Sequence, residues 1–140
     1  MMEIRKVDDS FAVAPQMQPD EMAALAGGGF TAVICNRPDG EEPGQPALDD
    51  MRRAAQDAGL AFHHIPVAGG LFPPAAVAAF AAIRRGTPGK VLGYCRTGTR
   101  SITLDALANT GGLSTEERIA RAQAAGYDLS TLAERMEAGG

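Results

Sequence analysis

The sequence predicts an α/β fold: a single domain over residues 1–140, with a mainly parallel central sheet flanked by helices. Short runs rich in β-branched and aromatic residues alternate with helical patterns, which is typical of a parallel sheet covered by helices. The length of 140 residues suits one domain, and 45% hydrophobic with 21% charged residues is an ordinary globular composition. No internal repeat or long polar linker divides the chain.

Four strands and a weaker fifth are expected, at residues 11–14, 30–36, 61–67 and 90–94, and more weakly at 3–7. Between them, apolar residues recur at helical spacing, as with Ala76, Phe80 and Ile83. Prolines suit first helical turns and glycines follow the last periodic residues. The C-terminal third is expected to be helical, with Ser114 and Glu117 at the spacing of a capping box.

Charge and cysteine content exclude several classes of protein. The net charge of -4 leaves no broad basic face for nucleic acid or anionic lipid. Residues 1–9 lack the apolar core of a signal peptide, and no run is long enough to span a membrane, so we expect a cytoplasmic protein. Cys35 and Cys95 lie in no pattern of metal-ligand spacing, so we expect neither a metal nor a cofactor.

The most informative stretch is residues 90–101, which reads as a strand, a short loop and the start of a helix. The strand should bring Cys95 to the carboxyl edge of the sheet, where ligands bind in open α/β sheets. Gly98 lets the backbone turn so that successive N–H groups form an anion-binding nest, to which the helix start adds its own. We therefore predict an anion-binding loop made of Arg96, Thr97, Gly98, Thr99, Arg100 and Ser101.

This loop should also activate Cys95. Positive potential from the amides, the helix end and Arg100 favours the thiolate, which is the nucleophilic form of cysteine. Arg100 can hold an oxyanion with two parallel N–H bonds. We therefore predict Cys95 and Arg100 as the catalytic residues. A buried cysteine that only packs is the alternative, and it is the simpler explanation for Cys35.

The segment CRTGTR from Cys95 to Arg100 resembles the active loop C-R-x-G-x-R of rhodanese sulfurtransferases. Together with NRPDGE at 36–41 and HIPV at 64–67, it makes most of the chain resemble the phosphatase-like domain of the beta-lactamase-hydrolase-like family. The resemblance implies a fold like that of dual-specificity and tyrosine phosphatases. Members of the family are described either as phosphatase-like or as sulfur transferases.

Two departures from the phosphatase pattern affect the expected chemistry. Only four residues separate Cys95 from Arg100, where the phosphatase loop has five. Residues 68–70 are Ala-Gly-Gly, where dual-specificity phosphatases place a general-acid aspartate. General-acid help is worth about 10²- to 10⁴-fold, and it matters most for poor leaving groups. Sulfane-sulfur transfer needs it much less, because sulfite or a thiolate leaves as a stable anion.

We therefore favour a sulfurtransferase that carries sulfane sulfur as a persulfide on Cys95. A phosphatase of phosphotyrosine or other aryl phosphates, acting through a phosphocysteine, is the alternative. A non-catalytic module that binds an anion or persulfide is the third hypothesis. The expected ligand is a small sulfur-containing or phosphorylated anion, and sulfur transfer would imply a functional partner in sulfide or persulfide oxidation.

Other polar residues lie near the same predicted edge. Arg37 and Asp39 follow the neighbouring strand and are candidates for substrate contact. Asp39 and Glu41 lie on the same sheet edge as Cys95 and could reach the pocket, although Pro-Asp-Gly is a common turn and a solvated turn is the preferred interpretation. Arg84 stands in the last turn of a helix, where its charge complements the dipole. The charged residues 116–121 are expected to form a solvated helix face.

Overall fold

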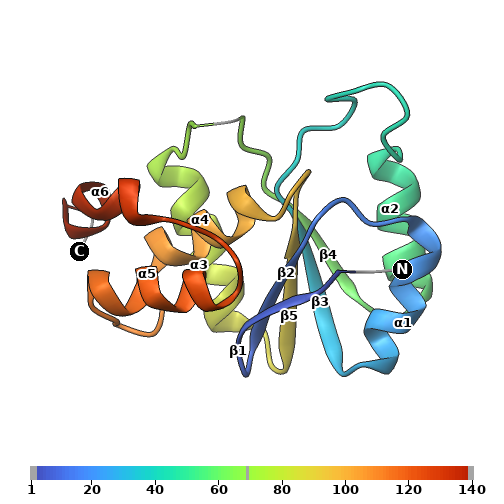
Figure 1. The fold of residues 1–140 in the computed structure, drawn as a ribbon. Coiled ribbons are helices and arrows are strands. Elements are labelled where there is room, and N and C mark those ends of the chain that lie inside the picture. Colours follow the sequence, from blue (N-terminus) through green and yellow to red (C-terminus); the bar gives the residue numbers. More distant parts are fainter. Residues whose placement is uncertain (1–2, 69, 139–140) are drawn as a thin grey trace.

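A mixed five-stranded sheet forms the centre of the protein (Figure 1). The computed structural model describes residues 3–68 and 70–138, so Gly69 of the predicted Ala-Gly-Gly segment lies outside the described residues. The strand order is β1-β2-β5-β3-β4, with β1 antiparallel to β2 and all other neighbours parallel. The strands are β1 (Arg5–Asp8), β2 (Phe11–Ala14), β3 (Phe30–Cys35), β4 (Ala61–His64) and β5 (Lys90–Tyr94). This arrangement confirms the predicted fold class.

Helices cover both faces of the sheet (Figure 1). One side carries α1 (Met22–Gly27) and α2 (Leu48–Asp57), and the other carries α3 (Pro74–Gly86), α4 (Thr99–Ala108), α5 (Thr115–Ala124) and α6 (Ala133–Ala138). Short 3-10 helices, η1 (Pro19–Glu21) and η2 (Ser130–Leu132), precede α1 and α6. Each face of the sheet buries its own hydrophobic cluster. In the described part of the chain, no helix is both long and apolar enough to cross a membrane.

Strand β5 lies in the middle of the sheet and is buried from Val91 to Tyr94. Val91 packs into the cluster on one face, and Leu92 packs into the cluster on the other, as the alternation of a strand requires. Gly93 faces the start of α4, where an added Cβ would lie 3.1 Å from the Cβ of Ser101. The missing side chain lets α4 approach the strand closely. The short distance between the two elements restricts the conformations that the connecting loop can adopt.

Strand β4 ends earlier than the sequence predicts. The predicted strand covers residues 61–67, whereas β4 ends at His64. Ile65 and Val67 still donate their N–H groups to carbonyl groups at and just after the end of β3, at 2.9 and 3.2 Å. Pro66 between them has no N–H to donate, so regular pairing stops. The irregular extension brings Val67 to the carboxyl edge of the sheet.

Two arginines on helices make contacts that link neighbouring elements. Arg84 pairs with Asp105 at 2.8 Å and with Asp8 at 3.1 Å, contacts that link α3 to α4 and β1. Arg118 is only 6% exposed and donates to the carbonyl oxygen of Ala106 at 2.8 Å. The prediction of a solvated face at residues 116–121 is therefore wrong at Arg118, because α4 and α6 pack against α5 there.

Candidate active site

Cys95 lies at the carboxyl end of β5, in the turn that leads into α4. Gly98 has φ +93, a left-handed conformation that glycine adopts readily, and α4 begins at the next residue. The turn brings the N–H of Gly98 to 3.1 Å from the Sγ of Cys95, to which it donates a hydrogen bond. An amide pointing at this sulfur is what an anion-binding loop requires.

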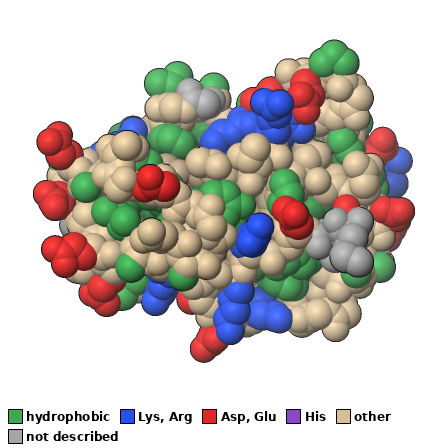
Figure 2. Space-filling model, viewed as in Figure 1, with side chains coloured by type: hydrophobic (Ala, Val, Ile, Leu, Met, Phe, Trp, Pro, Cys, Tyr) green, Lys and Arg blue, Asp and Glu red, His purple; other side chains and the backbone are tan. Residues whose placement is uncertain are grey.

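The sulfur is buried in this conformation. The exposed fraction of Cys95 is 0%. A cavity of about 350 Å³ lies beside the loop and is lined by Arg37, Glu41, Glu42, Arg96, Thr97 and Arg100. Figure 2 shows basic side chains gathered beside acidic ones over one edge of the molecule. Cys95 is not among these lining residues, so the local structure must change before a reactant can reach the sulfur.

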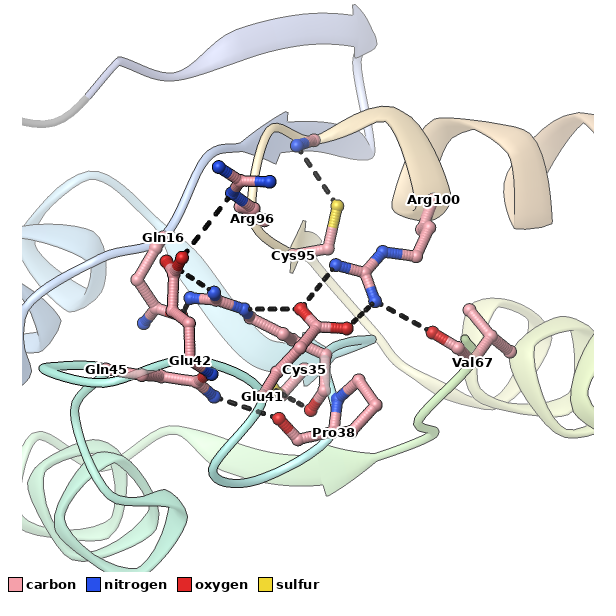
Figure 3. Close-up of polar contacts among 12 residues, drawn as sticks. Gln16, Cys35, Pro38, Glu41, Glu42, Gln45, Val67, Cys95, Arg96 and Arg100 are labelled. Carbon is pink, nitrogen blue, oxygen red and sulfur yellow. Dashed lines mark hydrogen bonds and ion pairs between the residues drawn. The ribbon is translucent and has the colours of Figure 1, made fainter. Parts of the chain in front are cut away.

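Arg100 is fixed by three of its five N–H donors. Nη1 donates to Glu41 Oε2 at 2.8 Å and to the carbonyl oxygen of Val67 at 2.9 Å, and Nη2 donates to Glu41 Oε1 at 2.8 Å. The Nε–H and one N–H of Nη2 remain on the other edge of the guanidinium. Figure 3 shows Cys95 across the guanidinium from Glu41. Arg100 therefore presents its open edge toward the side of the sulfur.

Glu41 is held by two arginines. In addition to its two bonds from Arg100, it accepts one at 2.8 Å from Nε of Arg37. The hydrogen bonds from Arg100, followed by those from Arg37, lower the pKa of the Glu41 carboxyl from 4.5 to about 2. The carboxylate is therefore ionised at neutral pH and has no proton to donate.

Arg37 is 1% exposed and connects several segments. Its Nη1 donates to Gln16 Oε1 at 3.0 Å, and its Nη2 forms an ion pair with Glu42 Oε1 at 2.6 Å without hydrogen-bond geometry. These contacts join the segment after β2, which carries Gln16, to the loop after β3, which carries Glu42. Arg37 thus lines the cavity while holding both carboxylates in position.

Other predicted loop residues have separate partners. The buried Ser101 donates its hydroxyl to Asn36 Oδ1 at 2.8 Å, which ties α4 to the end of β3. The hydroxyls of Thr97 and Thr99 lie 3.0 Å apart. Arg96 is 65% exposed and lies 3.8 Å from Glu42, a loose ion pair. Of the predicted anion-binding residues, Arg96, Thr97 and Arg100 line the cavity.

Asp39 lies apart from the cavity lining. Its Oδ1 accepts the N–H of Leu48 at 3.0 Å, at the start of α2. This contact holds the loop after β3 against α2. Asp39 therefore supports the loop that carries Glu41.

The sequence places Glu41 on the same sheet edge as Cys95, and Glu41 does line the cavity, but its pairing with Arg100 is not predicted. Glu42 is not predicted, although it follows Glu41 in the same loop. Tyr127 donates its hydroxyl to the carbonyl oxygen of Thr97 at 2.9 Å, and no local pattern marks that residue. The described residues contain no group of three or more His, Cys, Asp or Glu side chains that could hold a metal ion.

Replacing Glu41 by glutamine should make stability depend on pH in a defined way. The folded-state pKa of Glu41 is about 2, below the ordinary value of 4.5, so its ion pairs stabilise the fold fully above pH 4.5. That contribution is lost as the pH falls toward 2. Urea denaturation should give Glu41→Gln a free energy of unfolding lower by up to about 1 kcal/mol at pH 7. A difference that persists unchanged at pH 2 would contradict this assignment.

Comparison with known proteins identifies the family. The model for the phosphatase-like domain of beta-lactamase hydrolase-like proteins matches residues 3–112. A beta-lactamase hydrolase-like protein from Xylella fastidiosa (strain Temecula1) is 38% identical over 130 residues, covering 91% of this chain and 30% of that protein. A relative from Agrobacterium fabrum is 32% identical over 97% of this chain and 32% of its own length. The chain therefore spans about a third of these curated relatives.

Solved structures agree with this grouping. A candidate phosphatase from Neisseria meningitidis Z2491 is 34% identical, with a TM-score of 0.86 over 98% of both chains. Kinase associated phosphatase, at 14% identity, has the same fold, with a TM-score of 0.72 over 97% of this chain and 91% of that chain. The expected likeness to dual-specificity and tyrosine phosphatases is confirmed at the level of the fold. The chain therefore belongs to the beta-lactamase hydrolase-like family, in which it corresponds to the phosphatase-like domain.

Proposed function

We propose that this chain is a cysteine-dependent phosphatase that hydrolyses aryl phosphate monoesters, including phosphotyrosine-like esters, through a phosphocysteine on Cys95. The observation that carries the proposal is the donor set beside the sulfur, formed by the Gly98 N–H and the open edge of Arg100. Such donors suit the oxygens of a phosphoryl group. Membership of a phosphatase-like family supports the same reaction.

The proposed reaction has two steps. The Cys95 thiolate attacks phosphorus and forms an S–P bond, while the bond from phosphorus to the leaving oxygen breaks and its electron pair goes to that oxygen. Water then attacks the phosphocysteine, the S–P bond breaks, and inorganic phosphate leaves with the thiolate restored. Arg100 and the loop amides hold the non-reacting oxygens in both steps.

The substrate class follows from the proton donors near the site. Glu41 is ionised at neutral pH, and the described residues Ala68 and Gly70 carry no acid. A leaving oxygen must therefore depart as an anion or take its proton from water. Aryl oxides are stable anions, whereas serine and threonine alkoxides are not. This difference favours small phosphorylated aryl anions as substrates.

Sulfur transfer, favoured in the sequence analysis, becomes the second candidate. Two observations fit that reaction. Only four residues separate Cys95 from Arg100, and Glu41 is ionised at neutral pH and so has no proton to donate. The family and the solved relative support the phosphatase better, because the matched domain is phosphatase-like and the relative from Neisseria meningitidis is a candidate phosphatase. Binding of an anion without turnover is the remaining alternative.

The rate of hydrolysis should depend steeply on the leaving group. For a series of substituted phenyl phosphates, we expect kcat/KM to rise as the leaving phenol becomes more acidic. A serine phosphate peptide should react about 10²- to 10⁴-fold more slowly than a good aryl substrate, since no general acid assists it. Release of inorganic phosphate at pH 7 measures both, with vanadate as the inhibitor control.

The same preparation distinguishes the alternatives. It should transfer little sulfur from thiosulfate to cyanide. Rapid formation of thiocyanate, without hydrolysis of any aryl phosphate, would replace the phosphatase by the sulfurtransferase. Binding of phosphate or vanadate with neither turnover would leave only the anion-binding module.

A further inference from the structure

The hydroxyl of Tyr127 contacts the active-site loop from a distant part of the chain. Tyr127 lies between α5 and η2, where its N–H donates to the carbonyl oxygen of Ala122 at 2.9 Å and its partly buried ring packs against the core. The hydroxyl donates to the carbonyl oxygen of Thr97 at 2.9 Å. The side chain is thus anchored at its base and bound to the loop at its tip.

The peptide unit between Thr97 and Gly98 connects this hydroxyl to the sulfur. In a planar trans peptide, the C=O and the following N–H point in opposite directions. The described part of the chain contains no cis peptide bond. The Thr97 C=O accepts from Tyr127, and the Gly98 N–H on the same unit donates to Cys95 Sγ at 3.1 Å. One rigid plane therefore has the tyrosine at one end and the sulfur at the other.

The opposite orientation of this peptide would disfavour the thiolate form of Cys95. If the unit turned over, the Thr97 carbonyl oxygen would face Cys95 and its partial negative charge would oppose a thiolate. Gly98 has no side chain to resist such a rotation. A bond to the outward carbonyl therefore favours the orientation in which the N–H faces the sulfur.

We propose that Tyr127 is a positioning residue, which holds the Thr97–Gly98 peptide so that its N–H points at Cys95. The inference deepens the proposed function, because the same N–H would face the phosphoryl group during attack. Close packing supports it, since a Cβ on Gly98 would lie 2.2 Å from the Tyr127 hydroxyl. Burial and the nearby charge of Cys95 raise the pKa of Tyr127, so its hydroxyl keeps the proton that it donates.

The test removes only the hydroxyl. In Tyr127→Phe the ring remains to fill its place, and thermal unfolding checks that the fold is kept. Thiolate absorbance in the ultraviolet, titrated against Cys95→Ser as the blank, reports the ionisation of Cys95 without requiring substrate. We expect the titration midpoint to move about 0.5–1 pH unit higher, the effect of losing one oriented hydrogen bond. With an aryl phosphate, kcat at pH 7 should fall about 5- to 10-fold while KM changes little.

A further variant makes the result specific. Ser130→Ala removes another hydroxyl from the same segment, and it should leave the midpoint unchanged. A wild-type midpoint in a folded Tyr127→Phe would overturn the proposal. Absence of phosphatase activity in the wild type would refute the proposed function instead, and the titration would still test Tyr127.

Discussion

The Cys95→Ser variant is expected to hydrolyse aryl phosphates at least about 10⁴-fold more slowly than the wild type. A serine hydroxyl is not ionised at neutral pH, and Glu41, with its pKa lowered to about 2, is too weak a base to activate it. The loop and Arg100 remain, so the variant should still bind phosphate or vanadate. Steady-state hydrolysis and isothermal titration calorimetry measure these two properties separately.

Cys35→Ala is the matched control, because it removes the other thiol of the chain. Cys35 is buried at the end of β3, where its Sγ lies 3.4 Å from the carbonyl oxygen of Arg37. The Cys35→Ala variant should retain hydrolysis within about threefold of the wild type.

Acid quenching of the wild type during turnover should trap one phosphoryl group on Cys95. Undiminished activity in Cys95→Ser would exclude the phosphocysteine mechanism.

The second large effect is expected for Arg100→Lys, which should lower kcat/KM about 10²- to 10³-fold. Lysine keeps the positive charge but loses the planar pair of donors that can face two phosphoryl oxygens. It also cannot reproduce the two parallel bonds to Glu41 at 2.8 Å, so its ammonium group would lose its fixed direction. Rates with a good aryl phosphate, under conditions well below KM, measure this loss.

Arg96→Lys provides the comparison within the same loop. Arg96 is 65% exposed, and its ion pair with Glu42 is long at 3.8 Å. An exposed pair of this kind contributes little, so the variant should remain within about threefold of the wild type. Equal losses in Arg96→Lys and Arg100→Lys would mean that general positive charge, rather than an oriented guanidinium, binds the substrate.

The fold was predictable because its signals are local. The buried residues of β5 and the periodic apolar residues of α3 each mark an element without reference to the rest of the chain. Ion pairs between distant residues carry no such signal. Arg84 meets Asp8 across 76 positions, and this contact depends on how α3 and β1 are brought together.

Part of the candidate site could likewise be predicted from the sequence, and part of it could not. The loop from Cys95 to Ser101 is contiguous, so its glycine, arginine and helix start could be read together. Glu41 reaches Arg100 across 59 positions and Tyr127 reaches Thr97 across 30, and both contacts required the folded chain. The preferred reaction also changed. The rhodanese-like loop and the absence of a general acid favoured sulfur transfer, whereas the matched phosphatase-like domain and the solved relative favour the phosphatase.

Tyr127, which contacts the loop at Thr97, lies beyond the segment that the family model matches, because that segment ends at residue 112. Ala122, Leu129 and Met136 follow that point as well, and they are buried in the same cluster as Ile102 of α4. A protein shortened to the recognisable segment would expose this apolar surface and free the Thr97 carbonyl. The residues that complete the core and hold the loop therefore extend beyond the segment that the family model matches.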